Sequence, residues 1–223
     1  MIEYGAEGTL GDAYMFVCRL YRSVKEGAKI TIHHYTRHRF WWPKIENIYG
    51  LLPSLTVKFH DKPNGWKGVE RLEITPFPEL PFADPSRHNL PKEYVGLTVK
   101  TGRHSQKKRS IKPFIAEWII EDYEDYGLPV VLLGDELEAA GDRFETKNKN
   151  VIDLRGKTTL WEAFAICRDA KEFVGFQGML SFVALSQKVP TTVYVAHETD
   201  RHAVQTNIMS TEWKNYCVEV VQI

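Results

Sequence analysis

Two short turns that contain glycines lead into expected helices, and each could place a reactive or binding group at the start of its helix. The first, residues 8–11 in "EGTLGDAYMF", leads into Asp12 and then into an apolar periodic stretch. A carboxylate there could cap the helix that follows, or it could take a proton from a hydroxyl as a general base. The second turn, in "FVGFQGMLSF", joins an expected strand to an expected helix, whose free backbone N–H groups could bind a diphosphate.

Two further groups of residues could assist that second turn. A cation-rich segment, "KTGRHSQKKRS", could neutralise phosphates, although a solvated basic loop or a contact with nucleic-acid phosphates would have the same composition. A glycine and an acid after the apolar run "PVVLL" could meet a base or ribose, or simply cap the next helix. The candidate residues for a site that binds a diphosphate with its base or ribose are therefore Lys100, Arg103, Lys108, Gly134, Asp135, Gln177, Gly178 and Met179.

Histidines and tryptophans gather after the second expected strand, and their rings could stack on a sugar or a base. Together with the first glycine turn, the candidate residues for binding such a sugar or base are Thr9, Gly11, His34, Trp41 and Trp42. The spacing of His33, His34 and His38 fits no closed set of metal ligands, so we expect exposure or core packing there and no metal site. The sequence also has no Asp-x-Asp pair that could hold Mg²⁺.

Hydrophobic periodicity predicts the elements that would position these groups. In the first half it indicates a helix over residues 13–24 ended by Gly27, strands at "KITIHHY", "LTVKF" and "VERLEIT", and a loop with a short helix at 36–54. The run "PFPELPFADPSRHNLP" favours a linker, because each proline removes a backbone donor. We therefore expect domains at 1–90 and 91–223, and the last residues could pack back on the first domain.

The second half alternates short apolar strands with helices, a pattern typical of parallel βαβ units with helices on both faces of a sheet. The expected strands are "YVGLTV", "PVVLL", "NVIDL", "EFVG" and "TTVYV", and the expected helices are "KPFIAEWIIEDYEDYG", "TTLWEAFAICRDA" and "GMLSFVALSQK". The final "TEWKNYCVEVVQI" is expected to form a turn and a last strand. Ligands of open α/β sheets bind beyond the carboxyl ends of the strands.

The composition is that of an ordinary globular chain of 223 residues, 43% hydrophobic and 26% charged. Lys and Arg balance Asp and Glu at 29 each, so the overall charge gives no general nucleic-acid or membrane signal. The cysteines lie far apart, no apolar run reaches the roughly 20 residues that span a bilayer, and no basic-then-apolar leader pattern opens the chain. We expect a reduced, cytoplasmic protein without integral membrane association.

Several segments, in this order, resemble the heptosyltransferases of glycosyltransferase family 9. "GTLGDAYM" is similar to the family's "G-A-[LI]-G-D" loop, and "VGLTVKTGRHSQKKRS" to its "IGLHPGAGRPEKRW" segment. "NVIDLRGKTTL" is similar to "N-[IV]-x-D-L-x-G-K-T-[ST]-L", and "FVGFQG" to "FVG-x-[DE]-[SG]-G". The similarity spans most of residues 94–195 and a patch near the start. Three positions depart from the family pattern: Gln177 replaces an acid, Phe182 a histidine and Ser110 a tryptophan.

The resemblance implies a compact GT-B fold, in which two Rossmann-like, doubly wound parallel-sheet domains enclose a cleft and the N-terminal domain is reduced. It also implies metal-independent transfer of a sugar from a nucleotide-diphosphate donor to an acceptor hydroxyl, with Asp12 as the general base and no cofactor besides the donor. In this reading the candidate residues from Lys100 to Met179 lie on the donor side, those from Thr9 to Trp42 lie on the acceptor side, and the acceptor would be a glycan. Alternatives are a virus-encoded enzyme that acts on modified bases in DNA, and a non-catalytic domain that binds sugar nucleotides or glycans.

Overall fold

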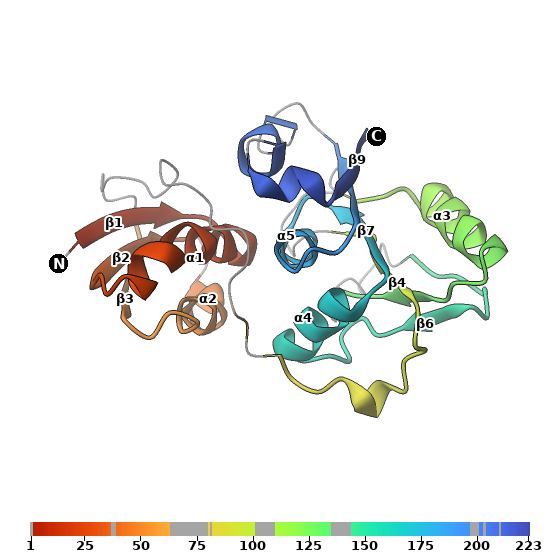
Figure 1. Ribbon diagram of the computed structural model, residues 1–223, viewed down its shortest axis with the longest axis horizontal. Helices are drawn as coiled ribbons and strands as arrows, with labels where there is room; N and C mark the ends of the chain where they lie inside the picture. The colour runs from red at the N-terminus through yellow and green to blue at the C-terminus, as the bar shows by residue number, and fades with distance from the viewer. Residues whose placement is uncertain are drawn as a thin grey trace. The chain divides into compact units, whose positions relative to one another are not determined.

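The computed structural model describes residues 2–36, 39–62, 80, 82–100, 110–134, 144–196, 201–202, 204–209 and 211–223. By its internal contacts the chain divides into two units, Met1–Pro81 and Phe82–Ile223, here called unit 1 and unit 2. Each unit has its own parallel sheet (Figure 1). The predicted mixed α/β class with parallel sheets is confirmed, whereas the cleft and the reduced size of the first domain stay predictions.

Unit 1 contains a three-stranded parallel sheet in the order β1-β2-β3, formed by Ile2–Glu7, Ile30–Tyr35 and Leu55–His60. The connections are α1 (Leu10–Lys25), the 3-10 helix η1 (Arg39–Trp41) and α2 (Trp42–Tyr49). Each strand is added on the same side of the previous one, so right-handed crossovers place α1 and α2 on one face of the sheet. Within its described residues unit 1 is therefore singly wound, and the expectation that the whole N-terminal domain is doubly wound stays a prediction.

α1 forms where hydrophobic periodicity predicted a helix. The side chains of Phe16, Val17 and Leu20 recur at helical spacing and are buried. The helix ends at Lys25, and the predicted terminator Gly27 follows two residues later. Gly27 has a φ of +91° that other residues adopt at a cost, and its N–H donates to the Val24 carbonyl at 2.9 Å. The buried apolar side of the helix faces the sheet. The first turn of the helix lies just beyond the end of β1.

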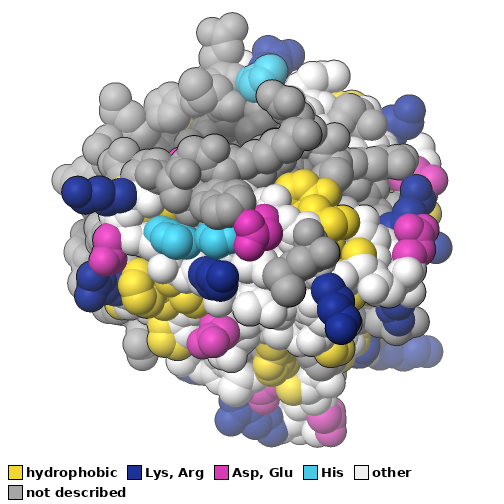
Figure 2. Space-filling model, turned by 90° about the vertical axis from the view of Figure 1, so that its left-hand side faces the viewer, with side chains coloured by type: hydrophobic (Ala, Val, Ile, Leu, Met, Phe, Trp, Pro, Cys, Tyr) yellow, Lys and Arg dark blue, Asp and Glu magenta, His cyan; other side chains and the backbone are white. Residues whose placement is uncertain are grey.

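The two neighbouring histidines of β2 point to opposite faces of the sheet, because side chains alternate along a strand. His34 faces the helices, whereas His33 lies with residues of the outer strands: its Nδ1 is 2.9 Å from His60 Nε2 and its Nε2 is 3.7 Å from Glu3 Oε1. Figure 2 views this side of unit 1, where histidine and acidic side chains gather. Among the described residues no three His, Cys, Asp or Glu side chains form a group that could hold a metal ion.

Unit 2 is a doubly wound α/β unit with a six-stranded parallel sheet in the order β6-β5-β4-β7-β8-β9. The strands are β4 (Val95–Thr98), β5 (Val130–Leu132), β6 (Val151–Asp153), β7 (Glu172–Phe176), β8 (Thr191–Val195) and β9 (Cys217–Gln222). The helices are α3 (Pro113–Asp125), α4 (Leu160–Asp169) and α5 (Met179–Ser186). α3 covers one face of the sheet, and α4 and α5 lie together on the other (Figure 1).

The direction of strand addition reverses between β4 and β7, which are neighbours in the sheet. This order is that of a Rossmann fold, in which ligands bind at the reversal point beyond the carboxyl ends of the strands. The strand centres are buried on both sides, as Leu97, Val130 and Val174 show. The sequence-based expectation of a doubly wound parallel sheet is thus met in this unit.

The end of the chain belongs to the second sheet. A π-helical turn (Gln205–Met209) and a 3-10 helix (Glu212–Asn215) lead into β9, which pairs with β8 as the edge strand. The turn and last strand are confirmed, and the idea that these residues also pack back on the first domain stays a prediction. The expected strand "VERLEIT" lies outside the described residues. None of the described helices is long and apolar enough to cross a membrane.

The segment that enters unit 2 is fastened to α4. The Arg168 guanidinium lies 4.1 Å from the centre of the Phe82 ring, and the Ala83 N–H donates to the Trp161 carbonyl at 3.4 Å. Further on, η3 (Ser86–His88) carries Arg87, whose side chain binds Glu162. These contacts place residues 82–91 within unit 2, whereas the expected boundary lay at residues 90 and 91.

Arg87 and Glu162 form a two-point ion pair at the start of α4. Arg87 Nε and Nη2 donate to the two carboxylate oxygens at 2.6 and 2.8 Å, and the Thr159 N–H donates to Glu162 Oε2 at 2.7 Å. The guanidinium, and after it the Thr159 amide, lower the pKa of Glu162 from the usual 4.5 to about 2. His88 Nε2 lies 3.6 Å from the same carboxylate.

Candidate functional site

Asp12 lies in the first turn of α1, exposed to solvent, just beyond the end of β1. The residue that precedes the helix is Thr9, and the Thr9 N–H donates to Asp12 Oδ2 at 2.7 Å while its hydroxyl lies 3.2 Å from the same oxygen. The alternative in which Asp12 itself is the N-cap is therefore wrong, because Asp12 occupies the third helical position of a capping box. The bond to the Thr9 amide still helps to close the helix start.

Gly8 lies directly against that carboxylate. Gly8 has a φ of +132°, and a side chain added to it would place Cβ 2.2 Å from Asp12 Oδ2. The Gly8 N–H donates to the Tyr35 carbonyl at the end of β2, at 3.1 Å. Sequence analysis named Thr9 and Gly11 but left Gly8 out of the candidate site. The close approach of the Asp12 carboxylate to the Gly8 backbone cannot be read from the sequence. Gly11 is half-buried in the first turn.

His34, expected on the acceptor side, is fully buried beneath this turn. Its Nδ1 lies 2.8 Å from the Tyr49 hydroxyl of α2, and its Nε2 lies 3.3 Å from the Gly8 carbonyl. Burial lowers the pKa of His34 from the usual 6.5 to about 4, and the bond to Gly8 only partly offsets this. The ring is therefore neutral at neutral pH, and it contacts the turn of Asp12 rather than solvent.

The two tryptophans also contribute less surface than the sequence suggested. Trp41 is 7% exposed, and Trp42 stacks on Phe59 with ring centres 5.0 Å apart and an angle of 14°. The Arg39 guanidinium lies 5.3 Å from the centre of the Trp42 ring. Phe40, which sequence analysis did not single out, is 44% exposed. Its ring is exposed to solvent, whereas Trp42 is half-buried.

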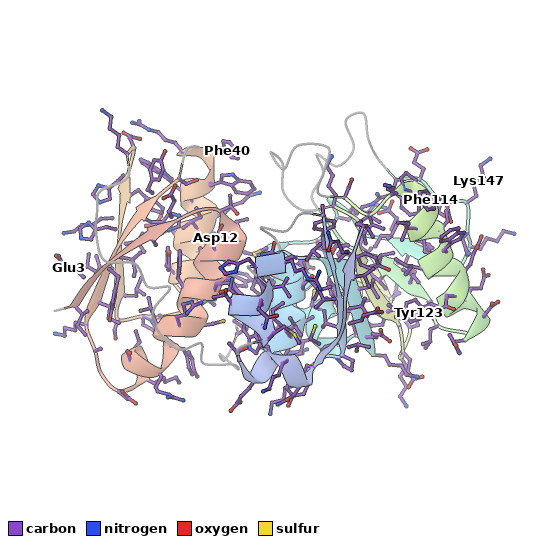
Figure 3. The ribbon with its side chains drawn as sticks, turned by 90° about the horizontal axis from the view of Figure 1, so that it is seen from above. Glu3, Asp12, Phe40, Phe114, Tyr123 and Lys147 are labelled. Atoms are coloured by element: carbon purple, nitrogen blue, oxygen red, sulfur yellow. The ribbon has the colours of Figure 1, made fainter. Side chains whose placement is uncertain are left out.

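These residues share one edge of the sheet in unit 1. Asp12 follows β1, and Phe40 follows β2; since the strands are parallel, both lie beyond the carboxyl ends. Figure 3 shows Asp12 at the start of α1 and Phe40 on the same side of unit 1, whereas Glu3 lies on the outer side of the sheet. The edge thus combines a carboxylate, an exposed ring and the Arg39–Asp61 ion pair. Such a set suits a hydroxyl-bearing ligand with a flat or apolar face.

In unit 2 the expected donor-side residues meet at the reversal point of the sheet. Lys100 follows β4, and Gln177 and Gly178 follow β7, which pairs with β4. Gly134 follows β5, the other neighbour of β4, and its carbonyl accepts from the Gly156 N–H at 2.9 Å. Met179 is the first residue of α5. Residues spread over 80 positions of sequence therefore line the carboxyl edge of three adjacent strands.

The start of α5 has no capping side chain and no negative charge that would compete with an anion. Its N-cap is Gly178, which has no side chain to bond the first N–H groups, and its first turn has no acidic residue. The positive end of the helix dipole and the backbone N–H groups there attract negative charge. By contrast, α1 and α4 begin with capping boxes that use Asp12 and Glu162. The sequence predicted this helix start from the strand and the glycine turn before it and from the apolar pattern of the helix.

Close packing fixes the strand that leads to α5. Gly175 lies opposite Thr98 in the sheet, and a Cβ at position 175 would be 2.2 Å from Thr98 Oγ1 and 3.0 Å from Ser181 Oγ. The Ser181 hydroxyl donates to the Phe176 carbonyl at 2.7 Å, which joins α5 to the end of β7. Sequence analysis missed both hydroxyl residues; their position, at a strand end and one turn into the next helix, was the available signal.

Three expected donor-side residues, Arg103, Lys108 and Asp135, lie outside the described residues, as does His38. Lys100 is half-buried and pairs with Ser110 in an isolated antiparallel bridge. A pocket beside β6, lined by Glu145, Thr146, Asn148, Val151, Asp153 and Arg155, contains none of the expected residues. The described candidate site of unit 2 is therefore the edge formed by Lys100, Gly134 and the start of α5.

No protein-family model matches the sequence, and no curated protein matches it. Solved structures do match. The ADP-heptose LPS heptosyltransferase II of E. coli superposes with a TM-score of 0.60 at 14% identity, over 100% of this chain and 90% of that one. The chain has a heptosyltransferase-like fold.

Two other structures share this heptosyltransferase-like fold. The iron-containing dodecameric glycosyltransferase TibC from enterotoxigenic E. coli matches with a TM-score of 0.58 at 13% identity, over 95% of this chain and 61% of TibC. TibC was also solved in complex with ADP-D-beta-D-heptose. A glycosyl transferase of family 9 from Veillonella parvula matches with a TM-score of 0.51 at 11% identity, over 86% of this chain and 80% of that one. At these identities the likeness establishes the fold.

Proposed function

We propose that this protein is a cytoplasmic glycosyltransferase that moves a sugar from a nucleotide-diphosphate donor to an acceptor hydroxyl, without a metal ion. The observation that carries the proposal is the reversal point of unit 2, where a helix start without a capping side chain and the residue Lys100 share one sheet edge. That edge suits a diphosphate, because backbone N–H groups and a cation both favour it. The heptosyltransferase-like fold supports the same function.

In this proposal Asp12 of unit 1 is the general base. The acceptor oxygen attacks the anomeric carbon of the donor sugar, and its proton passes to the Asp12 carboxylate. The new C–O bond forms as the bond between the anomeric carbon and the diphosphate oxygen breaks, through an oxocarbenium-like state. The bonding electron pair leaves on the nucleoside diphosphate, whose negative charge is stabilised by Lys100 and the N–H groups at the start of α5.

For the donor we propose an ADP-linked sugar, because two of the structural neighbours are named for ADP-heptose or were solved with it. A thermal-shift screen with ADP, UDP, GDP and their sugar derivatives tests this choice. A ligand at 100 times its Kd adds about 2.7 kcal/mol of stability, so a true donor raises Tm clearly. If none of these nucleotides raises Tm, the proposed donor site is wrong.

For the acceptor we propose a glycan, with Phe40 stacking on a sugar face at the edge that Asp12 occupies. Release of ADP from ADP-heptose, measured with an oligosaccharide and with duplex DNA containing hydroxymethylated bases, separates a glycan acceptor from a DNA base. Release with DNA alone would support the alternative of a DNA-modifying enzyme.

A binding domain without activity is the second candidate function. It is favoured by Phe182, which stands where the resembled family has a histidine and which is buried against Trp213 with ring centres 6.0 Å apart. A donor that raises Tm without any ADP release, for every acceptor tried, would support this reading.

Substitution of Asp12 tests the base directly. Asp12→Asn keeps an oxygen that can accept from the Thr9 N–H, so we expect the fold and the donor Kd to change little. We expect the transfer rate to fall by about 10²- to 10⁴-fold, the usual contribution of a general base. The control is Glu26→Gln at the far end of α1, which we expect to be as active as the parent protein. Equal rates for Asp12→Asn and the parent would refute the assignment.

A further inference from the structure

His34 is a buried polar side chain that the proposed chemistry does not use. Its ring is enclosed by the rings of Phe16, Tyr49 and Phe59, with centres 6.5, 5.5 and 6.0 Å away. A buried histidine in such a setting costs free energy unless its nitrogens are hydrogen-bonded. Both nitrogens have partners: the Tyr49 hydroxyl at 2.8 Å from Nδ1 and the Gly8 carbonyl at 3.3 Å from Nε2.

These partners determine how the ring is protonated. A carbonyl oxygen can only accept, so Nε2 carries the proton and donates to Gly8, and Nδ1 accepts from the Tyr49 hydroxyl. The bonds form a chain from α2 through β2 to the turn after β1. At the far end of this chain Gly8 lies against the Asp12 carboxylate, close enough that no Cβ fits between them.

We propose that His34 is a positioning residue for Asp12: by holding the Gly8 carbonyl, it fixes the turn against which the carboxylate rests. The inference depends on the proposed function only for its effect on the reaction; the hold on the turn is a separate property. A general base must lie within hydrogen-bond reach of its proton, and a displacement of about 1 Å can cost about 10²-fold in rate. His34 thus acts on the reaction from beneath the turn, without contact to a substrate.

The groups that face the His34 ring support this role. They are the Gly8 carbonyl from the end of β1, the Tyr49 hydroxyl from α2, and the Phe16 and Phe59 rings from α1 and β3. In these surroundings the neutral ring is favoured, because burial lowers the pKa of His34 to about 4. The same donor and acceptor arrangement therefore persists across the neutral pH range.

Three variants test the inference. His34→Gln can still donate a hydrogen bond to Gly8, whereas His34→Phe fills the space without a donor. Ile32→Ala, on the same face of β2 and fully buried, is the control for lost stability alone. Two measurements are made on each: hydrogen exchange of the Thr9 amide, which the bond to Asp12 protects, and kcat and KM for ADP release from ADP-heptose.

For His34→Phe we expect Thr9 exchange to quicken at least about 10-fold and kcat to fall about 10- to 100-fold, with the donor KM unchanged within about 2-fold. We expect His34→Gln to keep Thr9 exchange and kcat close to the parent values. Ile32→Ala should change Thr9 exchange and kcat only as far as it lowers the stability of the whole fold. If His34→Phe does not fold, Tyr49→Phe carries the test, with smaller changes in the same direction. Thr9 exchange that stays at the parent rate overturns the inference.

The design also separates this inference from the base assignment. If Asp12→Asn abolishes ADP release and His34→Phe leaves kcat unchanged, the positioning role is wrong and the base stands. If Asp12→Asn has no effect, the base is wrong, and Thr9 exchange still decides whether His34 holds the turn. In the double variant Asp12→Asn with His34→Phe, the two losses of kcat should not add, because both substitutions act through the Asp12 carboxylate and are therefore coupled.

Discussion

A side chain at position 8 would collide with the carboxylate that we propose as the base. We expect Gly8→Ala to lower the free energy of unfolding by about 2 kcal/mol or more, since it combines a strained positive φ with a Cβ only 2.2 Å from Asp12 Oδ2. The displaced carboxylate should also slow transfer. Urea unfolding of the purified variant measures the first effect, and ADP release the second.

The matched control is Gly27→Ala at the other end of the same helix. Gly27 also has a positive φ, +91°, but a Cβ there would meet nothing within 4 Å. This variant should therefore cost about 1 kcal/mol from backbone strain alone and leave the transfer rate unchanged. If the two alanine variants are equally stable and equally active, the contact between Gly8 and Asp12 has no consequence.

At this scale the sequence located Asp12 and the glycine turn but could not separate neighbouring residues by their surroundings. His33 and His34 are adjacent in sequence, yet one faces the outer side of the sheet and the other the helices. Trp41 is buried, whereas Phe40 beside it is exposed. Exposure depends on packing between elements, which residue types and spacing do not specify.

β4, β7 and the first turn of α5 pack so closely at Gly175 that no side chain fits there. We expect Gly175→Ala to destabilise unit 2 by about 1–3 kcal/mol, the usual cost of overpacking a core, and to weaken nucleotide binding, because its Cβ would push on Thr98 and Ser181. Adding Thr98→Ala removes the oxygen 2.2 Å away and should recover part of the stability. No recovery in the double variant, measured by urea unfolding, would mean that the clash lies elsewhere.

Most elements were predictable because their apolar residues follow the period of a helix or a strand over enough length. The strands of unit 2 and the helices between them match the expected segments. Parallel pairing then brings Lys100, Gly134 and Gln177 to one edge, although the sequence separates them widely. The single winding of the described strands of unit 1 was not predictable, since the order of strands depends on which edges remain open once the helices pack.

At the scale of the whole molecule, the Arg87–Glu162 pair should make unit 2 sensitive to acid. Because the folded-state pKa of Glu162 lies below the usual 4.5, its contribution is complete above pH 4.5 and is lost as the pH falls towards about 2. Unfolding followed from about pH 5 to about pH 3 should show a steeper loss of stability in the parent than in Glu162→Gln. Since Arg87 is 59% exposed, solvent screens the pair and the difference should be modest.

Glu93→Gln provides the comparison for that experiment. Glu93 pairs with Lys171 at 3.3 Å, but both side chains are more than half exposed, and such pairs contribute little. Its acid profile should follow that of the parent protein. A Glu162→Gln profile that also coincides with the parent would show that the pair does not anchor the segment entering unit 2.

The position of this segment explains where sequence analysis placed the domain boundary. Proline content marks the whole run of residues 76–91 as a linker, and the boundary was set at its end. The structure assigns residues from Phe82 onward to unit 2, through contacts of Phe82, Ala83 and Arg87 with α4. Composition reveals that a segment is irregular, but not which neighbour its side chains bind.

One buried cysteine lies in each unit: Cys18 on α1 and Cys167 on α4, while Cys217 at the start of β9 is partly exposed. Burial raises the pKa of all three thiols, so none is a ready nucleophile at neutral pH. Opening of either unit exposes its own thiol to an alkylating reagent. Peptide mapping of the modified cysteines can therefore measure the opening rates of the two units separately, from the rate at which Cys18 and Cys167 are alkylated.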